Sequence, residues 1–257
     1  MEYIIVGLAA AAASGLTLFS GFGLGTLLMP VFILFFPVDI AIAVTAIVHL
    51  LNNILKLILL GRYADREVVI KFGAAAVFFA LIGAWLLVWL SAHPAIFSYQ
   101  IAGKIFEVSP VNAVVGLLMI IFAILEMQPA DSRFTFDRKY LPVGGALSGF
   151  FGGLSGHQGA LRSAFLIRIG LSKESFIATG VVIACVIDIS RLFVYSSRFK
   201  LGFLYDHLWL VITAVLAAFA GVYIGNRLLK KITLRTVQFT VAGLLFLIAA
   251  GLLSGML

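Results

Sequence analysis

The chain has 257 residues, of which 63% are hydrophobic and only 11% are charged. About a quarter of the residues of a soluble domain are charged, so this composition excludes an ordinary water-soluble protein. The net charge of +7 comes from short basic clusters between apolar runs, which is typical of a membrane topology signal and not of a nucleic-acid-binding groove. We therefore expect a polytopic protein of the lipid bilayer with no nucleic-acid partner.

The first 36 residues are apolar but interrupted. The chain begins with MEYIIVGLAAAAASG, in which Glu2 is the only charged residue before the apolar run. Because a basic n-region is lacking, we interpret this run as a retained segment and not as a signal peptide. The run SGFGLG breaks residues 3–36. The piece after the break covers only about half to two-thirds of the hydrocarbon thickness. This pattern predicts a helical hairpin that returns to the side from which it came.

Three segments long enough to cross a bilayer follow, at 39–60, 69–91 and 111–127. Between the last two, residues 92–110 form a moderately polar connection, and the sequence leaves open whether it lies along the interface or acts as a lid. A second interrupted hairpin is predicted at 141–169, around the run GGLSGHQG. Three further spans follow it, at 175–196, 206–226 and 235–254.

The positions of Lys and Arg test this topology. If both interrupted regions are hairpins, twelve of the eighteen cations lie on one face, three lie on the other, and three fall at membrane depth. This bias places the cation-rich face in the cytoplasm and both termini outside an inner (cytoplasmic) membrane. The twelve are Arg62, Arg66, Lys71, Arg133, Arg138, Lys139, Arg168, Lys173, Arg227, Lys230, Lys231 and Arg235, the three opposite are Lys104, Arg198 and Lys200, and the three at membrane depth are Lys56, Arg162 and Arg191.

The two halves resemble each other at a constant offset of 134 residues. PVDIAIAVTAIV, which starts at Pro37, matches LSKESFIATGVV, which starts at Leu171, and the same offset pairs Gly25 with Gly159. Three spans per half invert the second half relative to the first. The predicted fold is an all-α integral membrane protein with two inverted repeats, 1–127 and 141–257, joined by a cytoplasmic linker at 128–140.

The two breaks are the predicted substrate site, because backbone that leaves a helix inside a bilayer persists only in protein or beside water. The helices that follow present free N–H groups and a partial positive charge, which suit an anion. Arg162 adds a full charge and a planar set of donors. The predicted binding residues are Gly21, Phe22, Gly23, Gly25, Gly156, His157, Gln158, Gly159, Arg162 and Ser163.

Each of these residues also has a structural interpretation. Arg162 could extend to the membrane interface, and His157 could pack or bond to a loop carbonyl. The glycines could serve only as contacts between packed helices. Cys185, the single cysteine, is interpreted as a small core residue.

A second polar set lies on the spans that follow the hairpins. His49, Asn52, Asn53 and Lys56 share one helical face, and Asp188 and Arg191 are three residues apart in the other half. Asp188 could neutralise Arg191 or Lys56, and the asparagines could join helices. Alternatively, Asp188 or His49 binds and releases a proton during transport.

The run GFGLGTLLMP, Gly21 to Pro30, resembles the sulfite exporter TauE/SafE family, also called the toluene-sulfonate uptake permease family. Its glycines and proline match the family pattern, although Leu24 stands where a further glycine is common. The second copy, SGHQGALRSAFL, keeps Gly156 and Gly159 but lacks the proline. The resemblance covers essentially the whole chain and implies transport of sulfite or a small organosulfur anion, in export or uptake.

The leading hypothesis is a secondary transporter that moves a small anion by alternating access. A passive anion channel is the alternative. We expect no enzyme, because neither an HExxH pattern nor a nucleophile with its base is evident. We expect no cofactor and no metal site, and the sequence allows a homodimer.

Overall fold

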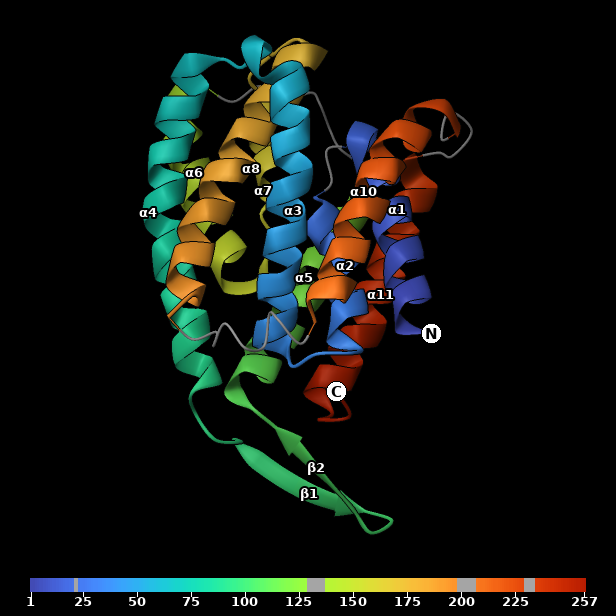
Figure 1. The fold of residues 1–257 in the computed structure, drawn as a ribbon. Helices are drawn as coiled ribbons and strands as arrows, with labels where there is room; N and C mark the ends of the chain where they lie inside the picture. Colours follow the sequence, from blue (N-terminus) through green and yellow to red (C-terminus); the bar gives the residue numbers. More distant parts are fainter. Residues whose placement is uncertain (21–22, 129–136, 198–206, 229–233) are drawn as a thin grey trace.

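The structure is a computed structural model that describes residues 1–20, 23–128, 137–197, 207–228 and 234–257 (Figure 1). Gly21 and Phe22 therefore lie outside the described residues, as do the loop cations Arg133, Arg198, Lys200, Lys230 and Lys231. The first half contains α1 Glu2–Ser20, α2 Leu24–Ile33, α3 Val38–Leu60, the 3₁₀ turn η1 Gly61–Tyr63, α4 Arg66–Ser91 and α5 Pro110–Met127. The second half contains η2 Arg138–Tyr140, α6 Leu141–Ser155, α7 Gly159–Ile167, α8 Lys173–Tyr195, α10 Leu208–Leu228 and α11 Leu234–Leu253.

Within the described residues, α3, α4, α5 and α8 are long and apolar enough to cross a membrane. α10 and α11, with 21 and 20 residues, are apolar helices of similar length. A 20-residue helix spans about 30 Å, the thickness of the hydrocarbon core. The predicted class, a helical integral membrane protein, is confirmed.

Two helices stop inside this bundle and are followed by short ones. α2 has 10 residues and starts directly after Gly23, and α7 has 9 residues and starts after Gly156–Gln158. At 1.5 Å per residue, each short helix is about half as long as the hydrocarbon core is thick. Both breaks occur at the glycine-rich runs noted in the sequence.

The breaks are held in place by helices from the opposite half of the chain. α1 packs along α10, and α6 packs along α4. α3 contacts α8, and α5 contacts α11, so these pairs also join the two halves. The buried apolar residues divide into a large core and a smaller one formed by α4, α6, α7 and α8.

The contact between α6 and α4 depends on small residues. Gly145, Gly149 and Gly153 recur every fourth residue on α6, and a Cβ on any of them would collide with a backbone carbonyl of α4. Gly221 makes the same kind of close approach to the Ala11 carbonyl, between α10 and α1. Such small-residue stripes allow membrane helices to approach closely when no hydrophobic effect drives them together.

Residues 92–110 correct the all-α prediction. β1 Phe97–Ile101 and β2 Lys104–Val108 form an antiparallel hairpin, in which Tyr99 faces Phe106. Ala102 and Gly103 form the turn, both with positive φ (51° and 80°), as a type I′ hairpin turn requires. The alternation of apolar and polar residues in FSYQI and the Ala-Gly pair are the sequence signals of this hairpin.

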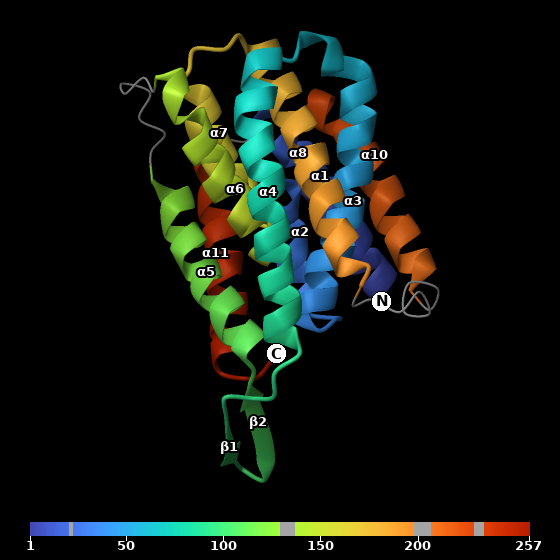
Figure 2. The same ribbon diagram turned by 90° about the vertical axis from the view of Figure 1, so that its left-hand side faces the viewer.

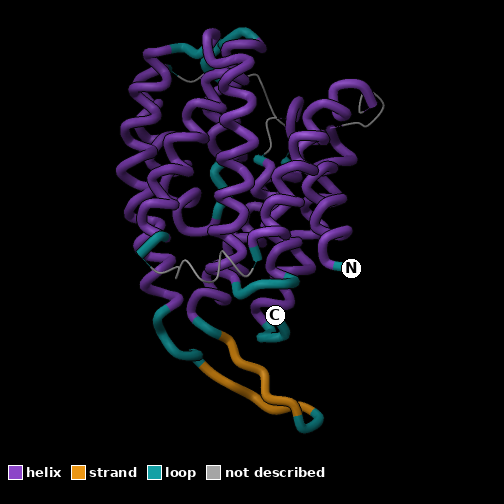
Figure 3. The backbone as a smooth tube through the Cα atoms, in the orientation of Figure 1, coloured by secondary structure: helices purple, strands orange, loops and turns teal. Residues whose placement is uncertain are grey.

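The bundle has two distinct ends (Figures 1 and 2). Both termini lie toward the end with the β-hairpin, and the turn η1 and the α7–α8 connection lie at the opposite end. Figure 3 shows the hairpin projecting beyond the helices. At the η1 end Arg138 binds Glu67 and Asp65, and the hydrogen bond to Glu67, followed by the charge of Asp65, raises the pKa of Arg138.

Gly149→Ala should destabilise the protein, because its methyl group has no space beside the Ala76 carbonyl. Overpacking of this kind costs about 1–3 kcal/mol. The thermal midpoint of purified protein in detergent measures the effect. Gly243→Ala is the matched control, since a Cβ at Gly243 meets nothing within 4 Å, and it should leave the midpoint unchanged. Equal midpoints for the two variants would contradict the packing argument.

Candidate functional site

The two helix breaks meet inside the bundle. A Cβ on Gly23 would lie 3.5 Å from the Cα of Gly159, and one on Gly25 would lie 3.5 Å from the carbonyl oxygen of Gly156. Gly23 precedes α2, and Gly159 begins α7. The amino-terminal ends of the two short helices therefore abut, although they are about 136 residues apart in the chain.

The end of α6 is stabilised by side chains of α8. Gly156 adopts the left-handed conformation (φ 78°) that commonly follows a helix, and its N–H donates to the Gly152 carbonyl. Arg191 Nη1 donates to the same carbonyl (3.1 Å), and the Tyr195 hydroxyl donates to the carbonyl of Gly153. The last carbonyls of a helix have no hydrogen-bond partner within the helix, and these bonds supply one. The charge of Arg191 also complements the negative end of the α6 helix dipole.

Asp188 lies at the centre of the polar network and is completely buried. His49 Nδ1 is 2.5 Å from Oδ2, and Oδ1 accepts from Gln158 Nε2 (2.8 Å) and Arg191 Nε (2.9 Å). The carboxylate thus joins α3, α8 and the loop before α7. Of the two structural pairings considered from the sequence, the described contacts show Asp188 with Arg191 and not with Lys56.

Arg162 is connected to this network but does not bind its carboxylate directly. Its Nη1 donates to Gln158 Oε1 (3.0 Å), and Gln158 in turn donates to Asp188. Arg162 is 7% exposed, so it does not extend to the interface. Its Nε lies against Gly180 of α8, where a Cβ would be 3.5 Å away. Ser163, the next residue of α7, is half-buried.

The polar residues of α3 form a continuous buried face. Ser14 of α1 donates to Asn52 Oδ1 (3.1 Å), so Asn52 joins two helices. The Asn53 amide is 3.2 Å from His49 Nε2, which suits a tautomer whose Nδ1–H points to Asp188. Lys56 is 7% exposed and forms no ion pair within the described part of the chain.

His157 occupies a different part of the site from the Asp188 network. Its Nδ1 is 3.1 Å from the Ser155 hydroxyl, which donates to the Phe151 carbonyl, so Nδ1 carries the proton. The imidazole stacks on the ring of Phe122 in α5, with centroids 4.9 Å apart and planes 4° apart. The other ring nitrogen, Nε2, is buried and has no hydrogen-bond partner in the described structure.

The site carries an excess of positive charge. The buried charged residues in the described ranges are Lys56, Glu126, Arg162, Asp188 and Arg191. Asp188 is neutralised by Arg191 at 2.7 Å, which leaves Arg162 and Lys56 without a carboxylate partner among the described residues. The first amides of α7 add a partial positive charge close to Arg162. This arrangement suits a small anion.

Three residues of the network were not assigned to the site from the sequence. Ser14 and Ser148 occupy equivalent positions at the offset of 134, and Ser148 donates to the backbone carbonyl of Gln158 (3.0 Å). The equivalent positions of the two serines could have identified both residues from the sequence. No sequence signal identifies Tyr195, because its role depends on where α6 ends.

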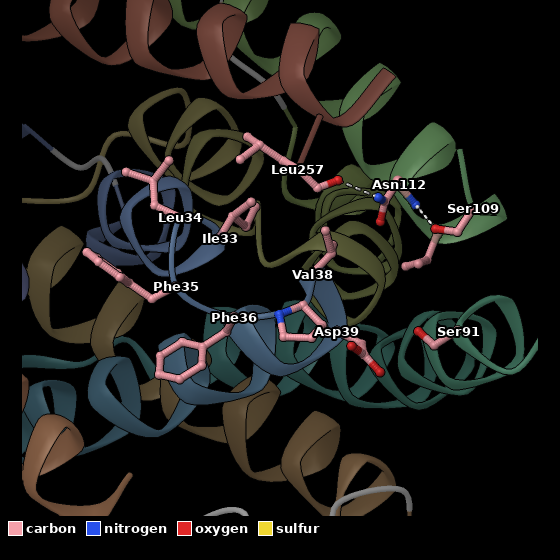
Figure 4. Close-up of a pocket in the computed structure, with 12 residues that line it drawn as sticks. Ile33, Leu34, Phe35, Phe36, Val38, Asp39, Ser91, Ser109, Asn112 and Leu257 are labelled. Carbon is pink, nitrogen blue, oxygen red and sulfur yellow. Dashed lines mark hydrogen bonds between the residues drawn. The ribbon is translucent and has the colours of Figure 1, made fainter. Parts of the chain in front are cut away.

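A separate cavity of about 560 Å³ lies at the hairpin end of the bundle (Figure 4). It is lined by the α2–α3 turn, the end of α4 and the start of α5, where Asn112 bonds to Ser109 and to the Leu257 carbonyl. None of the predicted binding residues lines it. α2, about 15 Å long, separates the cavity from the meeting point of the breaks.

Asp188→Ala should strongly destabilise the fold, because it leaves Arg191 buried without its counter-charge. Breaking such a pair costs about 3–5 kcal/mol. Ser190→Ala is the control on the same helix, since its hydroxyl bonds only to the Val186 carbonyl of its own helix. Thermal midpoints in detergent measure both, and an Asp188→Ala midpoint equal to that of the control would disprove the central role of Asp188.

Comparison with known proteins agrees with these features. The family model described as "Sulfite exporter TauE/SafE" matches residues 3–252, which is nearly the entire chain. No curated protein matched the chain individually. A match of this extent, over an apolar helical bundle, shows the family, and the chain belongs to the sulfite exporter TauE/SafE family of membrane transporters.

Proposed function

We propose that the protein is a secondary transporter that moves sulfite, or a small organosulfur or organic anion, across the cytoplasmic membrane by alternating access. The observation that carries this proposal is the meeting of two helix amino termini, at Gly23 and Gly159, beside the guanidinium of Arg162, which has no carboxylate partner among the described residues. Two positive helix ends that abut repel each other, and an anion between them removes the repulsion.

The residues of the breaks divide into three roles. Gly23, Gly25, Gly156 and Gly159 would let the backbone approach the anion, and Arg162 would supply the charge. Gln158, Ser163 and His157 would orient the anion. With the proton on Nδ1, as the contact with Ser155 favours, His157 Nε2 is a hydrogen-bond acceptor, so it suits an anion that carries a hydroxyl group.

The other polar residues would hold this arrangement together. Arg191 and Asp188 fix the end of α6 and the side chain of Gln158. His49 joins α3 to α8, Asn52 joins α3 to α1, and Asn53 contacts the His49 ring on its own helix. Asp188 already accepts from three residues, which favours a positioning role over the proton-carrying role considered from the sequence.

An inverted repeat agrees with the helix boundaries and contacts. The bounds of α2 and α3, shifted by 134 residues, match those of α7 and α8 to within one residue. Under the same exchange, the α1–α10 contact corresponds to the α6–α4 contact, and the α2–α11 contact corresponds to the α7–α5 contact. We propose that the η1 end faces the cytoplasm and the hairpin end, with both termini, faces outward.

Burial favours a carrier over a passive channel. Gln158, Asp188 and Arg191 are at most 1% exposed, and Arg162 is 7% exposed, so the site is closed to bulk water in this conformation. A carrier opens such a site to one side at a time, which gives saturable flux and counterflow. A channel would show neither.

Arg162→Ala should abolish anion binding while the protein remains folded. The measurement is the thermal shift of purified protein with sulfite, sulfate, thiosulfate, sulfonates and carboxylates. The wild type should be stabilised by at least one of them, because a ligand that binds only the folded state raises its stability by about 2.7 kcal/mol at a hundred times its Kd.

Arg168→Ala is the matched control, because Arg168 follows the last residue of α7, outside the helix break. It should keep the anion-dependent shift. Counterflow of the same anion in proteoliposomes then separates carrier from channel. An Arg162→Ala protein that is stabilised like the wild type would refute the proposed site.

A further inference from the structure

Glu126 is a buried acid that the proposed site does not use. It is 3% exposed, and neither carboxyl oxygen has a hydrogen-bond partner among the residues that the structure describes. An ionised carboxylate without partners is very unfavourable in a low-dielectric interior, whereas the protonated acid is tolerated there. The position therefore favours a carboxyl group that holds a proton.

A single side chain lies between Glu126 and the anion site. It follows Phe122 by four residues on α5, so both side chains lie on the same buried face. The Phe122 ring stacks on His157, which belongs to the second helix break. α5 also contacts α7 directly, so the carboxyl lies about one helical turn from a ring that covers the site.

No charged group among the described residues of the neighbouring helices compensates Glu126. The helices in main contact with α5 are α3, α4, α6, α7 and α11, and α6 carries no titratable residue. None of the titratable residues of the others lies within hydrogen-bonding or ion-pairing distance of the carboxyl oxygens. These residues are Asp39, His49 and Lys56 on α3, Arg66, Glu67 and Lys71 on α4, Arg162 on α7 and Arg235 on α11.

Glu126 is the second-last residue of α5 and lies close to the surface of the bundle. α5 runs away from the β-hairpin, toward the η1 end of the bundle (Figure 2). The next residue, Met127, is 39% exposed, so the carboxyl is buried only one residue away from an exposed surface. A proton that enters at this end of α5 would not need to pass through the anion site.

We infer that Glu126 binds the proton that is transported together with the anion, an inference that rests on the proposed transport function. When Glu126 is ionised, its charge repels an anion at the breaks. When it is protonated, the repulsion is absent, and the anion binds. The two loading events thus favour each other, as coupled transport requires.

The test uses full-length protein in proteoliposomes with radiolabelled sulfite, and protein-free liposomes correct for leakage. Wild-type protein should accumulate sulfite when a proton gradient is imposed and should also exchange sulfite without a gradient. Glu126→Gln mimics the protonated acid permanently. It should retain exchange but lose gradient-driven accumulation by about tenfold or more.

Glu174→Gln, which removes an exposed carboxyl at the start of α8, is the matched control and should behave like the wild type. Infrared spectroscopy of protein without any anion supplies an independent measurement. The wild type should show the C=O stretch of a protonated carboxylic acid, and Glu126→Gln should lack it. The thermal midpoint of Glu126→Gln should not fall, because the change removes no partner.

Two results would overturn the role of Glu126: gradient-driven accumulation that persists in Glu126→Gln, or an infrared band that the variant retains. Loss of the gradient response in Asp188→Asn alone would assign the proton to Asp188 instead. A wild type that exchanges no sulfite would contradict the proposed function, and the infrared band would then decide whether Glu126 holds a proton.

Discussion

The architecture depends on the satisfaction of peptide groups that two helices expose when they end inside the bundle. Hydrocarbon offers no water to these groups, so each must find a partner in the protein. At the end of α6 the partners are Arg191 and Tyr195, and the left-handed Gly156 closes the turn. Asp188 then becomes necessary, because Arg191 could not remain buried without a counter-charge. The amino terminus of α7 is the end at which we propose that the anion binds.

This sequence of requirements explains why so many polar residues occur in a chain that is 63% hydrophobic. His49 and Gln158 complete the hydrogen bonds of Asp188, and Gln158 fixes Arg162. Stability and the proposed binding chemistry therefore share the same residues. Arg162 and Lys56 are the exceptions, because no described acid compensates them, and this uncompensated charge is the basis of the proposed anion site.

Much of this could be predicted from the sequence. The glycine runs located both helix breaks, since glycine is the residue that tolerates sharp turns and close approach. Helical spacing placed His49 and Lys56 on one face. The sequence offered Arg191 and Lys56 as partners of Asp188, and the structure shows the pair with Arg191. The family resemblance agreed with the match over residues 3–252.

What could not be predicted depends on contacts between distant segments. The pairing of Gln158 with Asp188, and of Tyr195 with the Gly153 carbonyl, requires knowledge of where α6 ends and how α8 crosses it. Glu126 appeared only as one acid in an apolar span, and its lack of partners became visible in the packed bundle. The β-hairpin was not predicted because its two strands have only five residues each and stand in a chain dominated by helical periodicity.

The exchanged packing of the broken helices has a mechanical consequence. The glycine stripe of α6 fits a helix of the first half, and α1 lies against a helix of the second. The bodies that could rock against each other therefore do not coincide with the two halves of the chain. Either half, produced alone, would expose a groove shaped for a helix that it does not contain, so the halves can mature only by assembling with each other.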